Sequence, residues 1–160
     1  MTATRTTPTG LRFRPLPAPL PDIDQLPRSL VRRVVADAPH AYPCRRCLRD
    51  AEVGDDLVLF PYDPFLGDSP YRQPGPIFVH ERECTPDPAD LASAPEQLRR
   101  RQLSLRGFDL SHQLVATVVV EGVETDAAVA ALLDDPAVDY VHVHNAAPGC
   151  FAVRVERSGG

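Results

Sequence analysis

The chain has 160 residues and a formal net charge of −5, with 43% apolar and 24% charged residues. This is the composition of a soluble globular protein, and the chain is long enough to bury a hydrophobic core. The negative charge and the lack of Trp argue against nucleic acid as a partner, and no apolar run is long enough to span a membrane. Lysine is absent, a bias that indicates a GC-rich bacterial genome.

Proline and apolar patterns divide the chain into two parts. We predict a disordered tail over residues 1–10 and a single domain over 11–157, with a proline-rich, metal-binding part (11–94) and a β-α-β-β part (95–157). In the first part, we predict helical turns over 22–30, a loop over 63–75, a connector over 85–94, and strands over 11–16, 32–37, 57–62 and 76–80.

The second part carries the clearer signals. Helices are predicted over residues 95–103 and 125–133, the second with an apolar face and followed by Pro136. Strands are predicted over 114–120, 138–144 and 150–156, the last two joined as a hairpin. The predicted fold class is therefore α+β: a mixed or antiparallel sheet with few short helices, ending in a β-α-β-β unit.

Two closely spaced pairs of soft metal ligands stand far apart in the sequence. Cys44 and Cys47 form a CxxC pair, and His80 and Cys84 form an HxxxC pair. A structural zinc ion takes four nitrogen or sulfur donors in tetrahedral geometry, so this spacing predicts zinc as the cofactor. Nearby arginines are expected to offset the charge of three thiolates: Arg45, Arg46, Arg49 and Arg82.

Other interpretations of these residues stay open. The cysteines could be small core residues, and His142, His144 or Cys150 could replace one of the proposed ligands. A Cys-His-Asn hydrolase arrangement can also be written, in which Cys44 attacks, His142 or His144 is the base and Asn145 orients the ring. The sequence does not decide whether the protein is an enzyme.

A second candidate site lies on the final hairpin. A period of two places Tyr140, His142 and His144 on one face and Val141 and Val143 on the other. On the returning strand, the same alternation points Phe151, Val153 and Val155 inward and Cys150, Arg154 and Glu156 outward.

The histidine-bearing face is either a solvated sheet face or the wall of a pocket for a small anionic molecule. The second alternative describes an enzyme acting on an anionic metabolite through Cys44 or through the His142 and His144 face, with Asn145 and Cys150 as further catalytic candidates. The side chains expected to bind the anion are Arg45, Tyr71, Arg106, Tyr140 and Arg154.

The N-terminus lacks the apolar segment of a secretory signal, so a cytoplasmic location is expected. Thiols stay reduced there, which favours metal binding or catalysis over disulfides. The oligomeric state is not predicted.

Four stretches of the chain resemble the bacterial domain-of-unknown-function family 1203. They are PCRRCLRDAEVGDDLVLFPYDPF (43–65), SPYRQPGPIFVHERECTP (69–86), RRRQLSLRGFD (99–109) and YVHVHNAAPGC (140–150). The resemblance covers nearly the whole chain after residue 10, and it implies no particular reaction because the family has no established activity. It implies that a family activity independent of zinc would rest on Cys44, Arg45, Arg106, Asn145 and Cys150.

Overall fold

The computed structural model describes residues 10–16 and 23–159. The predicted tail over 1–10 therefore lies, apart from Gly10, outside the described residues. The strands are β1 (Leu11–Arg14), β2 (Arg32–Val35), β3 (Asp56–Tyr62), β4 (Gly75–His80), β5 (Gln102–Phe108), β6 (Leu114–Glu121), β7 (Tyr140–Asn145) and β8 (Phe151–Arg157). The helices are α1 (Glu96–Arg99) and α2 (Thr125–Asp134), with 3-10 turns at Ile23–Gln25, Arg28–Leu30, Pro88–Leu91 and Gly122–Glu124.

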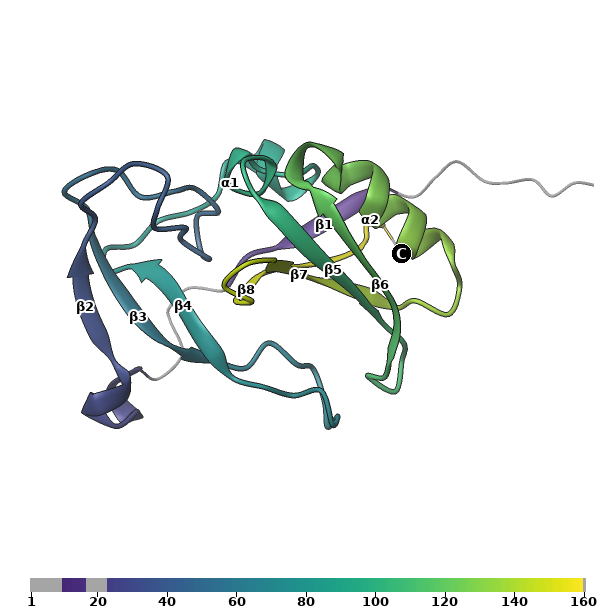
Figure 1. Cartoon of the computed structure of the whole chain (residues 1–160), viewed down its shortest axis with the longest axis horizontal. Coiled ribbons are helices and arrows are strands. Elements are labelled where there is room, and N and C mark those ends of the chain that lie inside the picture. The colour runs from purple at the N-terminus through teal and green to yellow at the C-terminus, as the bar shows by residue number, and fades with distance from the viewer. Residues whose placement is uncertain (1–9, 17–22, 160) are drawn as a thin grey trace, which may run out of the picture.

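The strands form two sheets that stand side by side (Figure 1). The large sheet has the strand order β1-β8-β7-β5-β6, and the small sheet has the order β2-β3-β4. Every pairing is antiparallel. This confirms the predicted α+β class with few short helices, although the strands are divided between two sheets.

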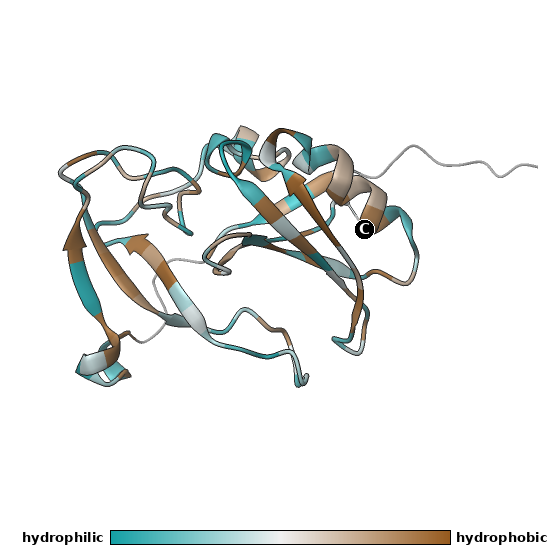
Figure 2. Cartoon of the chain, viewed as in Figure 1, coloured by the Kyte–Doolittle hydropathy of each residue, from teal (hydrophilic) through white to brown (hydrophobic). Residues whose placement is uncertain are grey.

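The large sheet buries one face under α2. Leu105 of β5, Val143 of β7 and Val153 of β8 lie in one cluster with Val129 and Leu133 of the helix. These side chains share a face because the register pairs Leu105 with Val143 and Val143 with Val153. Hydrophobic residues mark these strands and the helix in Figure 2. We call this side the helix-covered face and the opposite side the cleft face.

The sequence patterns located most elements correctly, with one clear error. The helix predicted over 95–103 ends at Arg99, and the segment from Gln102 is the interior strand β5. Leu103 and Leu105 alternate with Ser104 and Arg106, and both edges of this strand are paired, with β6 and with β7. Pairing on both sides and burial of the two leucines therefore outweigh the local helix propensity of the arginine-rich run.

A short segment joins the two sheets. Residues 43–50, which we call the knuckle, bridge to β4 through Cys44 and Phe78, while the backbone N–H of Leu16 donates to the carbonyl of Arg45. The Leu48 side chain is buried in the core of the large sheet. The knuckle therefore contacts both sheets at once.

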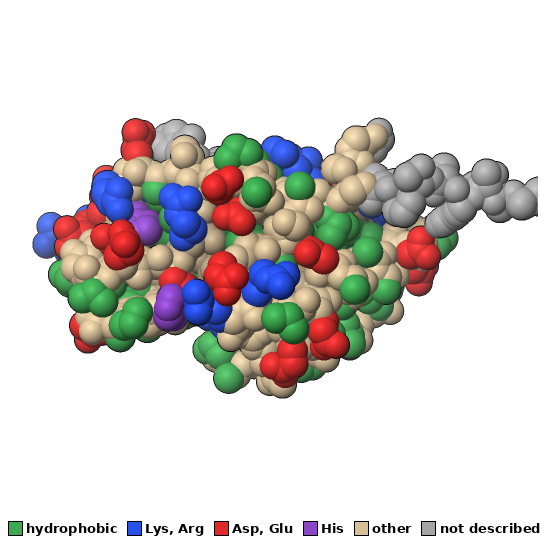
Figure 3. Space-filling view, turned by 90° about the horizontal axis from the view of Figure 1, so that it is seen from above, with side chains coloured by type: hydrophobic (Ala, Val, Ile, Leu, Met, Phe, Trp, Pro, Cys, Tyr) green, Lys and Arg blue, Asp and Glu red, His purple; other side chains and the backbone are tan. Residues whose placement is uncertain are grey.

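On the face seen in Figure 3, acidic and basic side chains are interspersed rather than gathered into a patch of one sign. Among the described residues, no helix has the length and apolar character needed to cross a lipid bilayer.

Candidate functional site

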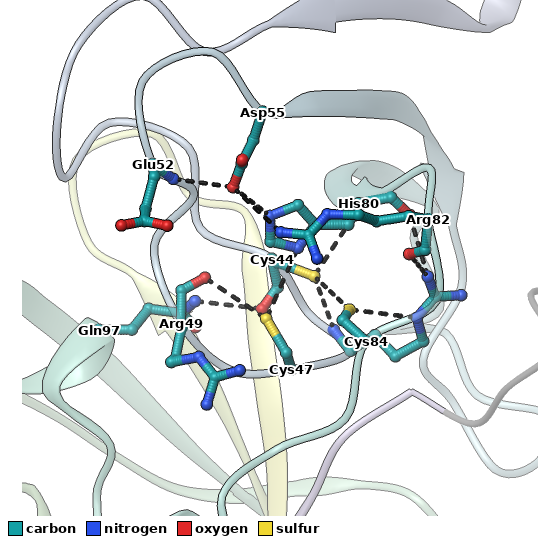
Figure 4. A network of polar contacts seen from close by, with 10 residues as sticks. Cys44, Cys47, Arg49, Glu52, Asp55, His80, Arg82, Cys84 and Gln97 are labelled. Carbon is teal, nitrogen blue, oxygen red and sulfur yellow. Dashed lines mark hydrogen bonds and ion pairs between the residues drawn. The ribbon is translucent and has the colours of Figure 1, made fainter.

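Four soft donors converge where the knuckle meets the end of β4 (Figure 4). The sulfurs of Cys44, Cys47 and Cys84 and a ring nitrogen of His80 all lie within 4.8 Å of one another. Around a tetrahedral zinc ion, two sulfurs stand about 3.8 Å apart and a nitrogen stands about 3.6 Å from a sulfur. The observed distances are 3.7 Å between the sulfurs of Cys44 and Cys84, and 3.6 Å between His80 Nδ1 and the Cys47 sulfur. The donor set therefore fits a zinc ion.

The local backbone explains how the CxxC pair faces one point. The N–H of Leu48 donates to the carbonyl of Cys44, and the N–H of Cys44 donates to the carbonyl of Arg49, closing a tight turn. Leu48 adopts a left-handed conformation with φ of 61°, which is unfavourable for a residue with a branched side chain. Burial of that side chain in the large core holds Leu48 there, so the turn is strained locally and stabilised by packing.

His80 is oriented by a carboxylate behind it. Its Nε2 lies 2.9 Å from Asp55 Oδ2, while Nδ1 faces the Cys47 sulfur. A histidine that donates one ring N–H to a carboxylate presents the lone pair of its other nitrogen to a metal. From the sequence, Asp55 is expected only as a turn residue; it does accept the Glu52 N–H in that turn, but it also positions His80.

The sulfurs receive hydrogen bonds from the surrounding chain. Cys44 Sγ accepts from the backbone N–H groups of Arg46 and His80, each at 3.4 Å. The buried Arg46 side chain donates from Nε to Cys84 Sγ, and from Nη2 to the carbonyls of His80 and Arg82. This guanidinium is therefore the counter-charge of the cluster. Arg45 makes no hydrogen bond with the cluster sulfurs; its guanidinium donates to Cys150 instead.

The protonation of the four groups is strongly coupled. The pKa of the Cys44 thiol is lowered, chiefly by hydrogen bonds with Cys47 and then with Cys84, whereas a hydrogen bond with Cys44 raises the pKa of Cys47. Hydrogen bonds with Cys44 and Cys84 also raise the pKa of His80 to about 10. A cation bound by these donors displaces their protons, so affinity for metal rises with pH.

A family model described as "Protein of unknown function (DUF1203)" matches residues 41–157. The chain belongs to this family. The resemblance seen in the sequence is thereby confirmed, and the matched range contains the whole four-donor cluster. Neither the curated proteins nor the solved structures gave a match to the chain.

A large cleft lies between the two sheets, next to the cluster. Its volume is about 1390 Å³, and its walls come from the knuckle, β3, β4, the 63–75 loop, β5, β6 and the turn between β7 and β8. The cationic side chains in these walls are Arg45, Arg72, Arg101 and Arg106, and the described lining residues include no carboxylate. All lining residues fall inside the family range, from Ala41 to Phe151.

The cleft face of the large sheet carries the predicted histidines. The register places Tyr140, His142 and His144 on this face, opposite the two valines, as predicted. The face is not solvated at its centre, because His142 is fully buried and its ring contacts Phe65 and Phe108. Burial lowers the pKa of His142 to about 3 and that of His144 to about 4, so both rings are neutral at physiological pH.

The predicted inward direction of Phe151 is wrong. The pairing between β7 and β8 shifts between Val143 and His144, so Phe151 stands opposite His144 instead of following the alternation of Val153. Its ring packs against His142 and His144 on the cleft face. A single β-bulge therefore moves this residue to the other side of the sheet.

The structure separates the catalytic candidates into different places. Among the described residues, neither His142 nor His144 hydrogen-bonds to Cys44: the ring nitrogens of His142 have no partner, and His144 Nδ1 contacts the carbonyl of Gly149. None of the suggested substitutes, His142, His144 or Cys150, joins the four-donor cluster.

The candidate anion-binding residues are likewise divided. Arg45, Tyr71 and Arg106 line the cleft. Tyr140 instead contacts His112 through its hydroxyl, at 2.8 Å. Arg154 pairs with Glu156 at 2.7 Å, so its charge is already compensated.

Proposed function

We propose that this protein is a zinc-binding protein in which Cys44, Cys47, His80 and Cys84 hold one structural zinc ion. The observation that carries this proposal is the convergence of the four donors within 4.8 Å, at separations typical of a tetrahedral site. The carboxylate of Asp55 behind His80 and the N–H groups directed at the sulfurs supply the outer contacts that such a site needs.

The donor types favour zinc over other divalent cations. Three thiolates and one imidazole suit a borderline-soft ion of tetrahedral preference, whereas magnesium and calcium require oxygen ligands. Four protein donors complete the coordination, so no position remains for a reacting water. This closed donor set supports a structural role for the ion.

The position of the cluster indicates what the ion would stabilise. Its ligands come from the knuckle, from the end of β4 and from the segment after β4, which are distant in the sequence. The knuckle and the segment after β4 lie outside the strands of both sheets, so strand pairing does not hold them in place. A structural zinc ion contributes on the order of 10 kcal/mol to folding, more than any single contact in this region.

The proposal is tested by zinc content and thermal stability measured on the same samples. Cys47→Ser is expected to lower the zinc stoichiometry and the midpoint of thermal unfolding together. Cys150→Ser is the matched control, because it makes the same chemical change outside the cluster and should retain one zinc per chain. Full zinc stoichiometry in Cys47→Ser would refute the assignment of that ligand.

The cysteines are expected to stay reduced, as in the cytoplasm, where we propose that the protein acts. In the structure all four cysteines are free. An oxidising compartment would instead favour a disulfide within the cluster and compete with the metal.

A further inference from the structure

The cleft contains a buried arginine side chain, Arg45, that is not paired with a carboxylate among the described residues. Arg45 is only 1% exposed, and its guanidinium donates to the carbonyls of Phe151 and Pro43 and to the sulfur of Cys150 at 3.2 Å. A buried charge is normally paired, because leaving it alone in a poorly solvated environment costs several kcal/mol. Among these three acceptors of the guanidinium, the Cys150 sulfur is the one that belongs to a side chain.

A second donor holds the same sulfur. Asn145 Nδ2 lies 3.4 Å from Cys150 Sγ, so the sulfur accepts from an amide as well as from a guanidinium. The oxygen of this amide accepts no hydrogen bond from the described residues. Asn145 is 5% exposed, and its Oδ1 has no hydrogen-bond partner within the protein. Asn145 and Cys150 both line the cleft, so a buried acceptor without a partner stands beside the sulfur.

Arg106 extends this cationic wall. Its Nε donates to Ser104 Oγ at 3.3 Å, and among the described residues it forms no ion pair. Two other arginines of the cleft are different, because Arg72 pairs with Asp63 at 2.8 Å and Arg101 pairs with Asp50 at 2.9 Å. Partial burial lowers the pKa of Arg106.

We propose that this cleft binds a small molecule carrying a carboxylate or phosphate group, anchored by Arg106, with the sulfur of Cys150 facing the bound molecule. This site is independent of the zinc cluster. Its chemistry is that of an oxyanion held by a guanidinium beside a sulfur already surrounded by donors.

The shape of the cleft suits a small metabolite. Its volume of about 1390 Å³ exceeds the usual range of ligand pockets, about 300–1,000 Å³, so a molecule of that class fits without rearrangement. Phe65, Tyr71 and Phe108 supply apolar surface to the lining of the cleft. The combination of an apolar wall and a few convergent polar groups is typical of such sites.

The test uses two alkylating probes of nearly equal size and different charge. Iodoacetate carries a carboxylate, and iodoacetamide is its neutral counterpart. In both reactions the Cys150 sulfur attacks the methylene carbon, a thioether forms and iodide leaves, so no further reactant is needed. The rate at Cys150 is followed by peptide mass spectrometry on the full-length protein, and the ratio of the two rates is the quantity compared.

The ratio of the iodoacetate rate to the iodoacetamide rate should depend on Arg106. Arg106→Gln is expected to lower it about tenfold by removing a charge-assisted contact. Arg72→Gln is the matched control, because it removes a cleft arginine already neutralised by a carboxylate, and it should leave the ratio unchanged. Arg106→Lys keeps the charge and should retain most of the preference, even if the glutamine variant folds poorly.

Protection by simple anions identifies the ligand class. Inorganic phosphate and malonate are each added in excess. The anion that slows labelling of Cys150 more strongly indicates whether the cleft prefers a phosphate or a carboxylate group. The proposal is overturned if neither anion protects Cys150, or if Cys150 reacts with neither probe. It is also overturned if Arg106→Gln and Arg72→Gln change the ratio equally.

Discussion

The cluster and the cleft lie on opposite sides of the knuckle, and their charged groups have different partners. Arg46 turns to the cluster, where it meets Cys84 and two carbonyls, while its neighbour Arg45 turns to the cleft and meets Cys150. In the cluster a carboxylate stands behind His80, and N–H groups point at the sulfurs. The cleft walls contain several guanidiniums and, among the described residues, no carboxylate.

This difference separates two kinds of site. A set of donors whose outer contacts are all supplied by the protein is closed and suits a structural ion. A cleft lining that carries guanidiniums, some of them without an ion pair, and no carboxylate is open and suits an anion from outside. Two adjacent arginines can therefore belong to different functions, although the sequence presents them as one basic pair.

The largest expected effect comes from replacing Arg46, the arginine of that pair that contacts the cluster. Arg46→Met leaves the carbonyls of His80 and Arg82 and the Cys84 sulfur without a donor, so the free energy of unfolding should fall by about 3 kcal/mol and zinc affinity about tenfold. Urea unfolding and competition with a fluorescent zinc chelator measure the two quantities.

Arg45→Met is the counterpart on the other side of the knuckle. It should also lower stability, because the carbonyls of Phe151 and Pro43 lose their donor, but zinc affinity should stay unchanged. Equal losses of zinc affinity in the Arg46 and Arg45 variants would contradict the division of the two sites.

A smaller effect is expected from the carboxylate behind His80. Asp55→Ala should weaken zinc binding about tenfold, because the histidine loses the acceptor that orients its ring. Asp63→Ala is the control, since that carboxylate pairs with Arg72 on the 63–75 loop, away from the cluster. Chelator competition on both variants checks the prediction, and wild-type affinity in Asp55→Ala would count against the assigned role.

The last effect is graded with pH, small near neutrality, and concerns the buried histidine at the cleft face. Burial holds the pKa of His142 at about 3, while a histidine in the unfolded chain titrates near 6.5. Between these pH values the unfolded state binds more protons than the folded state. The free energy of unfolding should therefore decrease as the pH is lowered, by at most about 1.4 kcal/mol per pH unit. The stabilisation from the neutral ring is present above about pH 6.5 and is lost as the pH falls.

His142→Phe should flatten this slope while keeping the ring contacts with Phe65 and Phe108. A residual slope is expected from His144, whose pKa burial lowers to about 4. Urea titrations at pH values where zinc stays bound measure both proteins. An unchanged slope in the variant would show that His142 does not govern the acid sensitivity.

Much of the site could be predicted from residue spacing. The CxxC and HxxxC pairs pointed to the four converging donors, because ligand chemistry limits which residues stand so close together. Asp55 was not recognised as their partner, since nothing in the local sequence distinguishes a turn aspartate from one that orients a distant histidine. The opposite directions of Arg45 and Arg46 depend on the knuckle turn, which is set by tertiary packing of Leu48.

The fold shows where local patterns mislead. The arginine-rich run before β5 resembles a helix, but Leu103 and Leu105 lie in a strand paired on both edges. The alternation in LSLRGF was the signal that could have identified it. At Phe151 no such signal exists, because a β-bulge depends on how two strands meet and leaves no mark in the sequence of either.

The central claim is most directly tested by X-ray absorption at the zinc edge on the purified full-length protein. The account predicts one zinc per chain with three sulfurs at about 2.3 Å and one nitrogen at about 2.0–2.1 Å. Absence of zinc, or a first shell dominated by oxygen, would contradict it.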